Sequence, residues 1–332
     1  MPELRIEARI EAKGVQSLIW NGESLFDWVG GGQRFELDGR TIPRGVYYAF
    51  RFDAAVVSPS GQYVVIYERL GTKGLLLCNG SIIREINRSY YHATAYEYPI
   101  CFAMLQDGRE VLIHCPEDYC RIDIEEAATG TRLTSSIERK PIDFFHSRLM
   151  VDRSNQWFIS AGWFWHPFDV LRLFSLAEAI SNPTSLDDSD VFPHQQVEVS
   201  TAGFAGSNKL LLSTSDETFS DGDYQENEFK PKSLGVWDIE ARRICSMVDT
   251  TEPAGTLMRI NDEFAVSFYK HPKIVNLRTG EITCRMSELN CGDQTSSIIH
   301  HIDALPPLAI DVANNRFAVA TSDQIVVVHV DI

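Results

Sequence analysis

The sequence lacks the features of a membrane protein, a secreted disulfide-rich protein or a zinc ribbon. No segment approaches the roughly 18 apolar residues that a membrane span needs, and the N-terminal MPELRIEARIEAKG alternates charged and apolar residues where a signal peptide has an apolar core. The seven cysteines are odd in number and scattered without a CxxC pair. We therefore expect a cytoplasmic, bacterial protein with reduced cysteines and no membrane partner.

Enzyme signatures and excess positive charge are also missing. The chain has no Walker loop, no dinucleotide-binding GxGxxG after a strand, no GxSxG and no HExxH, so no cofactor is predicted. With 30 Lys and Arg against 46 Asp and Glu, the formal net charge of −16 repels phosphate backbones. The charge excludes a nucleic-acid partner and favours a basic protein or peptide.

A short pattern recurs along the chain, in which a turn built on Gly, Asn or Asp precedes a run of apolar and β-branched residues. The copies read SPSGQYVVIY, LQDGREVLIH, DRSNQWFISA, AGSNKLLLST, RINDEFAVSF and VANNRFAVAT. Their equivalent turn positions are Gly61, Gly108, Asn155, Asn208, Asp262 and Asn315, at spacings of 47, 47, 53, 54 and 53 residues. One further period of 47 residues before Gly61 leads to Gly14, which predicts a seventh copy there.

A period of about 40 to 50 residues with several short strands per unit is typical of propeller blades, whose sheets bury both faces by stacking around an axis. The segment VWDIEARRIC, which follows the Asn208 copy, has the layout of a third strand, a turn and a fourth strand. IVNLRTGEITCRM and DIEEAATGTRLT repeat this layout. The chain thus resembles the WD40-like β-propeller superfamily, although Trp-Asp occurs once and the Gly-His pair of regular blades is missing.

We therefore predict an all-β fold, a seven-bladed β-propeller with four-stranded antiparallel blades. Residues 1–332 form one domain, with an acidic loop insertion at 215–233. The last unit offers three strands, whereas ELRIEARI at the N-terminus is an unassigned strand that can complete it. Of the two ways to close the ring, we favour closure by this N-terminal strand.

In such a ring, the loops from strand four to the next strand one and from strand two to strand three share one face. By our strand assignment, these loops hold seven of the nine histidines, which are His92, His146, His166, His194, His271, His300 and His301. They also hold the aromatic segments VYYAFRF, SYYHATAYEYP, DFFHS and GWFWHPFD. Exposed loops rarely carry so many large rings without a binding role.

The leading hypothesis is a non-enzymatic protein- or peptide-binding scaffold that uses this aromatic and His-rich face. Its acidity suits a basic partner, as in an immunity or antitoxin protein that masks a basic toxin. The predicted contacts are Arg44, Tyr48, Arg51, Arg88, Tyr91, His92, Tyr96, His146, Trp163, Trp165, His166 and His301. The alternative for Phe144, Phe145 and Trp163 is core packing, and we assign Trp237 to blade packing.

The rival hypothesis is an enzyme with a His/Asp site at the channel mouth, since the same fold supports different chemistries. Its candidate acids and bases are His92, Glu97, Asp143, His146, His301 and Asp303. Imidazoles also bind metals, and His92, His146, His166, His301 and Asp303 are the candidate ligands. No recognised ligand spacing links them, so we predict no metal and favour ordinary hydrogen bonds for these histidines.

Overall fold

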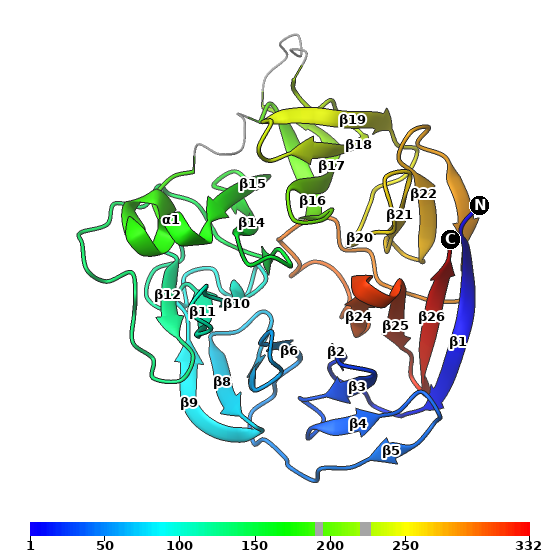
Figure 1. Ribbon diagram of the computed structural model, residues 1–332, viewed down its shortest axis with the longest axis horizontal. Coiled ribbons are helices and arrows are strands. Elements are labelled where there is room, and N and C mark those ends of the chain that lie inside the picture. Colours follow the sequence, from blue (N-terminus) through cyan, green and yellow to red (C-terminus); the bar gives the residue numbers. More distant parts are fainter. Residues whose placement is uncertain (190–194, 220–226) are drawn as a thin grey trace.

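Seven small antiparallel sheets stand in a ring around a central axis (Figure 1). The computed structural model describes residues 1–189, 195–219 and 227–332. Each sheet is one blade, and its first strand lies nearest the axis. The predicted seven-bladed β-propeller is confirmed.

The blades are numbered here in chain order. Blade 1 contains β2 (Ile19–Asn21), β3 (Ser24–Asp27), β4 (Gln33–Phe35) and β5 (Thr41–Ile42). Blade 2 contains β6 (Ala54–Val57), β7 (Tyr63–Tyr67), β8 (Lys73–Cys78) and β9 (Ser81–Asn87). Blade 3 contains β10 (Ile100–Met104), β11 (Glu110–His114) and β12 (Asp123–Glu126). Blade 4 contains β13 (Leu149–Val151), β14 (Trp157–Phe164) and β15 (Phe168–Ser175).

The remaining blades have four strands each. Blade 5 contains β16 (Val197–Phe204), β17 (Lys209–Thr218), β18 (Ser233–Asp238) and β19 (Arg243–Asp249). Blade 6 contains β20 (Leu257–Arg259), β21 (Phe264–Ser267), β22 (Lys273–Asn276) and β23 (Ile282–Arg285). Blade 7 contains β24 (Leu308–Asp311), β25 (Arg316–Ala320), β26 (Gln324–Asp331) and β1 (Glu3–Glu11).

Blades 3 and 4 have three strands in the described part of the chain, where four were expected. After β12, the chain makes only a single bridge between Glu125 and Arg132. After β15, it turns into the short helix α1 (Leu176–Ser181), which the Ser175 hydroxyl caps, and a 3-10 turn, Pro183–Leu186. Asn-Pro ends the helix, because proline cannot continue the hydrogen-bond ladder.

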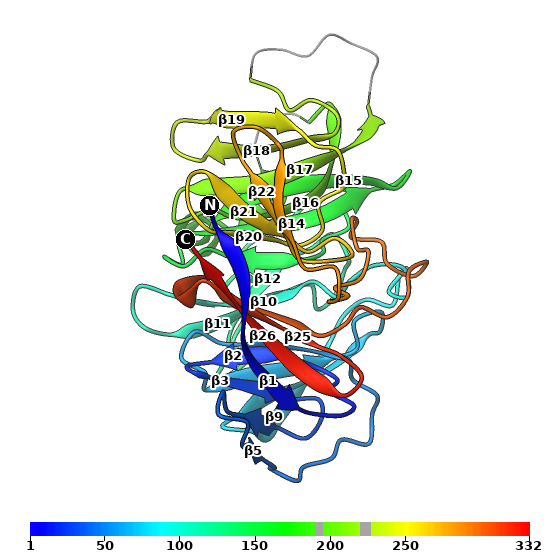
Figure 2. The ribbon, with the colours of Figure 1, turned by 90° about the vertical axis from the view of Figure 1, so that its right-hand side faces the viewer.

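The N-terminal strand closes the ring, as predicted. β1 pairs antiparallel with β26 from Glu3 opposite Asp331 to Glu11 opposite Gln324, with one irregularity between Ile6 and Ala8. Figure 2 shows the two strands side by side with both termini together. The first and last strands of the chain therefore share one sheet.

The six repeated turns all join the first and second strands of a blade. Gly61, Gly108, Asn155 and Asn315 have positive φ angles, a conformation that Gly and Asn adopt most readily. The seventh turn is wrong in the prediction, because Gly14 precedes blade 1 and Gly22 makes the equivalent turn between β2 and β3. The short hairpin of blade 1 breaks the 47-residue spacing.

The core lies between neighbouring blades. Middle strands such as β11 and β25 are buried along their whole length because each blade is covered on both faces, whereas the outermost β9 is mostly exposed. Trp237 on β18 is fully buried with Leu210 and Leu171, which confirms its assignment to blade packing. No helix in the described ranges is long and apolar enough to cross a bilayer.

Candidate functional site

The loops expected to gather on one face do so, because strands alternate in direction within each blade. We call this face the loop face. On blades 3 and 4 it carries a set of touching rings, the aromatic cluster, which consists of Tyr91, His92, Tyr96, Tyr119, Phe145, Trp163 and Trp165. The rings come from four separate loops and strand ends of these two blades.

Phe145 forms the centre of the aromatic cluster. Its ring stacks on Trp163 at 3.9 Å between centroids and on Tyr119 at 4.2 Å. Tyr91 extends the stack outward, 5.0 Å from Tyr119. Because Phe145 and Trp163 are buried, the stack is anchored in the core and ends at the surface.

Three rings of the aromatic cluster, those of Tyr91, His92 and Trp165, are exposed to solvent. Tyr91 is 44% exposed and Trp165 is 51% exposed, and the ring of His92 lies 5.0 Å from that of Trp165. His92 and His166 both have positive φ angles, and His166 stands exposed in the tight turn between β14 and β15. The aromatic surface is therefore continuous across the two blades.

Carboxylates flank this surface. The Tyr119 hydroxyl donates to Asp143 Oδ1 at 2.7 Å, and Asp118 precedes Tyr119 in the chain. Asp118 and Asp143 are both exposed. Burial, together with the bond to Asp143, raises the pKa of Tyr119, so this hydroxyl stays protonated and remains a donor. The aromatic cluster thus combines ring faces with fixed negative charge.

Four predicted contacts are buried, in contradiction to their assignment to the surface: Arg88, Tyr96, His146 and Trp163. Arg88 donates to the carbonyl oxygens of Gly71, Ala93 and Tyr96 and lies over the Tyr96 ring. Burial lowers the pKa of Arg88, and these carbonyls replace the lost water. For Trp163, as for Phe144 and Phe145, the core-packing alternative is the one observed.

His146 lies in the interior of blade 4. Its Nδ1 is 3.0 Å from the Ser160 hydroxyl, and burial, with the charge of Arg172 adding to it, lowers its pKa to about 3. The imidazole is therefore neutral in the folded protein. Its hydrogen bond to Ser160 links the loop before β13 to β14.

Arg44, Tyr48 and Arg51 lie in the loop between blades 1 and 2, away from blades 3 and 4. Arg44 donates to the Asn79 carbonyl at 2.7 Å, and Tyr48 packs edge-on to Phe52. Arg51 is exposed. The predicted contacts therefore divide into two sectors of the ring and do not form one patch.

A long loop crosses the channel mouth. Residues 286–307, here called the strap, connect β23 to β24 and run to the middle of the ring before turning back (Figure 1). The strap pairs with blade 3 through a bridge between Ile298 and Tyr96. The Ser297 hydroxyl donates to the buried Asp169 of blade 4 at 2.6 Å. The strap is thereby fixed to blades on the far side of the axis.

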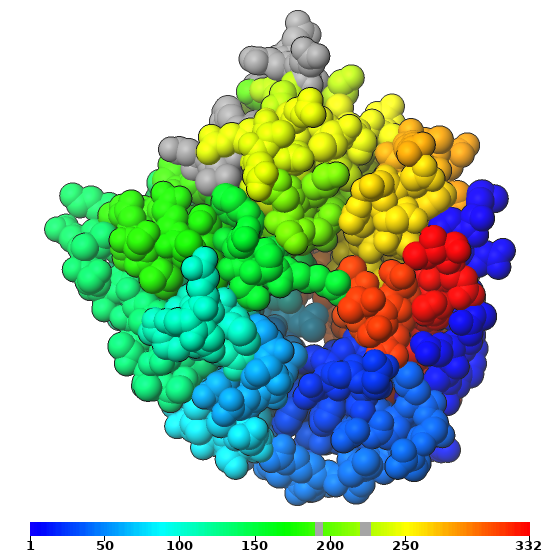
Figure 3. Space-filling model, viewed as in Figure 1, coloured from blue at the N-terminus to red at the C-terminus, as the bar shows by residue number. Residues whose placement is uncertain are grey.

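Two adjoining hollows lie beneath and beside the strap. The smaller one, about 300 Å³, takes its walls from blades 2, 3, 6 and 7, so it lies at the axis. The larger one, about 850 Å³, shares Arg69, Leu305 and Pro306 with it and includes Asp303 of the strap. Figure 3 shows the central opening of the ring in the space-filling view.

The candidate acids and bases of the enzyme hypothesis are not assembled into one group. In the described residues, no hydrogen bond or ion pair joins any two of the six side chains, which are His92, Glu97, Asp143, His146, His301 and Asp303. Nor does the described part of the chain contain three or more His, Cys, Asp or Glu side chains placed to hold a metal ion. His301 is exposed on the strap with its ring against His300. His194 and the middle of the acidic insertion, residues 220–226, lie outside the described residues.

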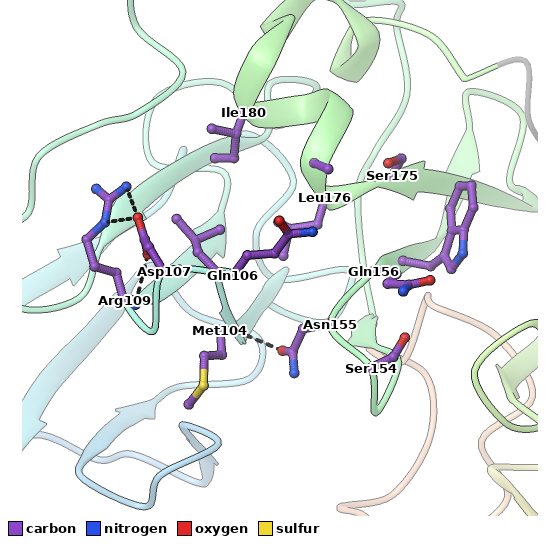
Figure 4. A pocket seen from close by; sticks show the side chains of 13 residues that line it. Met104, Gln106, Asp107, Arg109, Ser154, Asn155, Gln156, Ser175, Leu176 and Ile180 are labelled. Carbon is purple, nitrogen blue, oxygen red and sulfur yellow. Dashed lines mark hydrogen bonds and ion pairs between the residues drawn. The ribbon is translucent and has the colours of Figure 1, made fainter.

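The opposite face carries a hollow of about 730 Å³ that the sequence did not suggest (Figure 4). Met104, Asn155, Leu176 and Ile180 line it where the first hairpins of blades 3 and 4 meet α1. The Asn155 side chain accepts a hydrogen bond from the Met104 amide at 2.8 Å. Its walls hold no buried charged side chain among the described residues.

Sequence reasoning placed His300 and His301 in a loop of this face, but it missed the course of the strap across the channel mouth and the two hollows that adjoin it. The only signals were its length and the proline pair Pro306-Pro307 before the last blade. Tyr119 was also missed, although it follows the second strand of its unit in a loop of the predicted face. No known protein-family model and no curated protein matches the chain.

Proposed function

We propose that the protein is a binding module that recognises a basic segment of a protein partner through the aromatic cluster. The observation that carries this proposal is the stack of rings that starts in the core at Trp163 and ends half-exposed at Tyr91 and Trp165. Stacked rings fixed from below lose little side-chain entropy when a partner covers them. Such rings are therefore suited to serve as the anchor residues of an interface.

The charge around the rings selects the partner. Arginine and lysine bind over aromatic faces, and more strongly where a carboxylate stands nearby. Asp118 and Asp143 supply that carboxylate beside Tyr119. The net charge of −16 adds long-range attraction for a basic chain.

The test uses labelled nonapeptides rich in Arg, rich in Glu or uncharged, with binding followed by fluorescence anisotropy. We expect the Arg-rich peptides to bind best. Tyr91→Ala combined with Trp165→Ala should weaken their binding at least ~10-fold, equal to about 1.4 kcal/mol. The thermal midpoint of this variant should stay within a few degrees of the parent, because both rings are half-exposed.

A matched control removes two exposed aromatic side chains from another part of the propeller. Tyr47 and Phe50, in the loop between blades 1 and 2, are 90% and 46% exposed. Tyr47→Ala with Phe50→Ala should leave the binding within about twofold of the parent, a difference below ~0.5 kcal/mol. Equal loss in both double variants, or no preference for Arg-rich peptides, would overturn the proposal.

A further inference from the structure

The smaller hollow at the axis contains one pair of opposite charges. Arg69 follows β7 of blade 2, and Glu97 precedes β10 of blade 3. Arg69 Nε and Glu97 Oε1 are 4.0 Å apart, and their side chains are only 24% and 18% exposed. This distance is too long for a hydrogen bond, so the pair attracts without saturating its polar atoms.

Both side chains keep hydrogen-bonding capacity. Within the described residues, the Arg69 guanidinium donates no hydrogen bond, because the bonds of this residue come from its backbone. Glu97 Oε2 accepts from Gln294 of the strap at 3.0 Å, whereas Oε1 accepts no hydrogen bond from the described chain. A partly buried guanidinium and carboxylate oxygen that face a hollow are ready to bind polar groups of a ligand.

The Arg69 guanidinium keeps its positive charge in the hollow. Although burial opposes it, the field of Glu97 raises the pKa of Arg69, so the guanidinium stays charged. Burial raises the pKa of Cys291, another wall residue, to about 12, so its thiol stays neutral. The polar side of the hollow therefore presents one positive and one negative group.

The rest of the wall combines apolar side chains with the polar Thr256 and Gln294. Its apolar part includes Phe268 of blade 6 and Leu308 and Ile310 of β24. Its volume of about 300 Å³ is at the small end of ligand pockets. A ligand that complements these walls has two opposite charges close together and a short apolar body.

We propose that this hollow binds a free α-amino acid with an apolar side chain. Its carboxylate would pair with Arg69 and its ammonium with Glu97 Oε1, two groups that an α-amino acid carries on the same carbon. The side chain would lie against Phe268, Leu308 and Ile310. This site is separate from the aromatic cluster, and either proposal can fail without the other.

The first test titrates the full chain with L-leucine by isothermal titration calorimetry. We expect saturable binding with a Kd below about 1 mM. Leucinamide lacks the carboxylate and N-acetyl-leucine lacks the ammonium, so each should bind at least ~10-fold more weakly. These two compounds also represent the N-terminal and C-terminal residues of a peptide. No saturable heat with leucine, or equal affinity for either derivative, overturns the proposal.

The second test removes one charge. Glu97→Gln keeps an acceptor for Gln294 and should weaken leucine binding at least ~10-fold, equal to about 1.4 kcal/mol. Glu85→Gln, an exposed carboxylate on β9, is the matched control and should bind within about twofold of the parent. Parent-like affinity in a folded Glu97→Gln protein contradicts the assigned role of the carboxylate. The affinity for the Arg-rich peptides, measured by fluorescence anisotropy, should be the same in both variants.

Discussion

Arg88 illustrates how a residue type common at interfaces can serve the interior. Its guanidinium has three backbone carbonyls as acceptors and two tyrosine rings, Tyr96 and Tyr98, within 5 Å. The loop that carries Tyr91, His92 and Tyr96 is thus held by a cation inside it. The residue composition of a loop predicts rings and charges, but which of them face inward depends on contacts distant in sequence.

The lowered pKa of His146 makes the unfolding free energy depend on pH. Its pKa is about 3 in the folded protein and about 6.5 in the unfolded chain. Below pH 6.5 the unfolded chain therefore binds a proton that the folded protein does not, and stability falls as the pH drops toward 3. Between pH 7 and pH 5 we expect this residue alone to remove about 2 kcal/mol of unfolding free energy.

Urea unfolding of the parent and of His146→Gln at both pH values measures this contribution. The variant should lose about 2 kcal/mol less than the parent on acidification, whatever its stability at pH 7. His166→Gln, at an exposed turn, should follow the parent. Parallel losses in the parent and in His146→Gln would show that His146 becomes protonated in the folded protein.

At the scale of elements, β1 contributes to two hydrophobic clusters. Ile10 is fully buried with residues of blades 1 and 7, and Leu4 and Ile6 pack on the side of blade 6. Without β1, the edge of β26 and both clusters would be exposed to water. The strand therefore stabilises the contacts of blade 7 with both of its neighbours, blades 1 and 6.

Deletion of residues 1–12 should destabilise the whole ring. Truncation of a single buried isoleucine typically costs about 2 to 5 kcal/mol, so we expect the unfolding free energy to fall by more than about 5 kcal/mol. Circular dichroism during heating and in urea measures the loss. Glu7→Ala, an exposed change in the same strand, should cost less than about 0.5 kcal/mol. A deletion that melts like the parent would contradict the role assigned to β1.

The elements of the fold were largely predictable because the turn chemistry repeats. Gly and Asn at Gly61, Gly108, Asn155 and Asn315 reflect a backbone conformation that the same turn needs in each blade. The missing fourth strand of blade 3 was not predictable, since DIEEAATGTRLT has the same pattern as segments that do pair.

The candidate site was predictable only as a face. Tyr91 and Trp165 were named correctly as exposed rings, whereas Trp163, two residues before Trp165, is buried. The strap has no periodic pattern, and backbone bonds such as Glu97 N–H to the Ser297 carbonyl hold it. Such bonds carry no side-chain signature, so the hollow beneath the strap appears only in three dimensions.

At the scale of the whole molecule, charge and shape separate the two proposed sites. A basic peptide meets the field of a chain with net charge −16, whereas a free amino acid has no net charge. Salt screens the first interaction over a Debye length of about 10 Å at 0.1 M and affects the second mainly through the partly buried pair.

Ionic strength should therefore distinguish the two bindings. Raising NaCl from about 50 mM to about 500 mM should weaken binding of an Arg-rich peptide several-fold or more. Leucine affinity should change by less than about twofold over the same range, because Arg69 and Glu97 are mostly shielded from solvent. Anisotropy and calorimetry at four salt concentrations give both slopes. A peptide affinity that does not change with salt concentration would argue against electrostatic selection of a basic partner.

The pairing of β1 with β26 also sets an order of events during synthesis on the ribosome. The partner of Glu3 is Asp331, so β1 must wait until β26 has been made before its backbone groups are paired. Until then blades 1 and 7 each lack a neighbour, and their apolar faces stay open to other chains. A growing chain of this protein thus keeps these apolar faces open to other chains until β26 has been made.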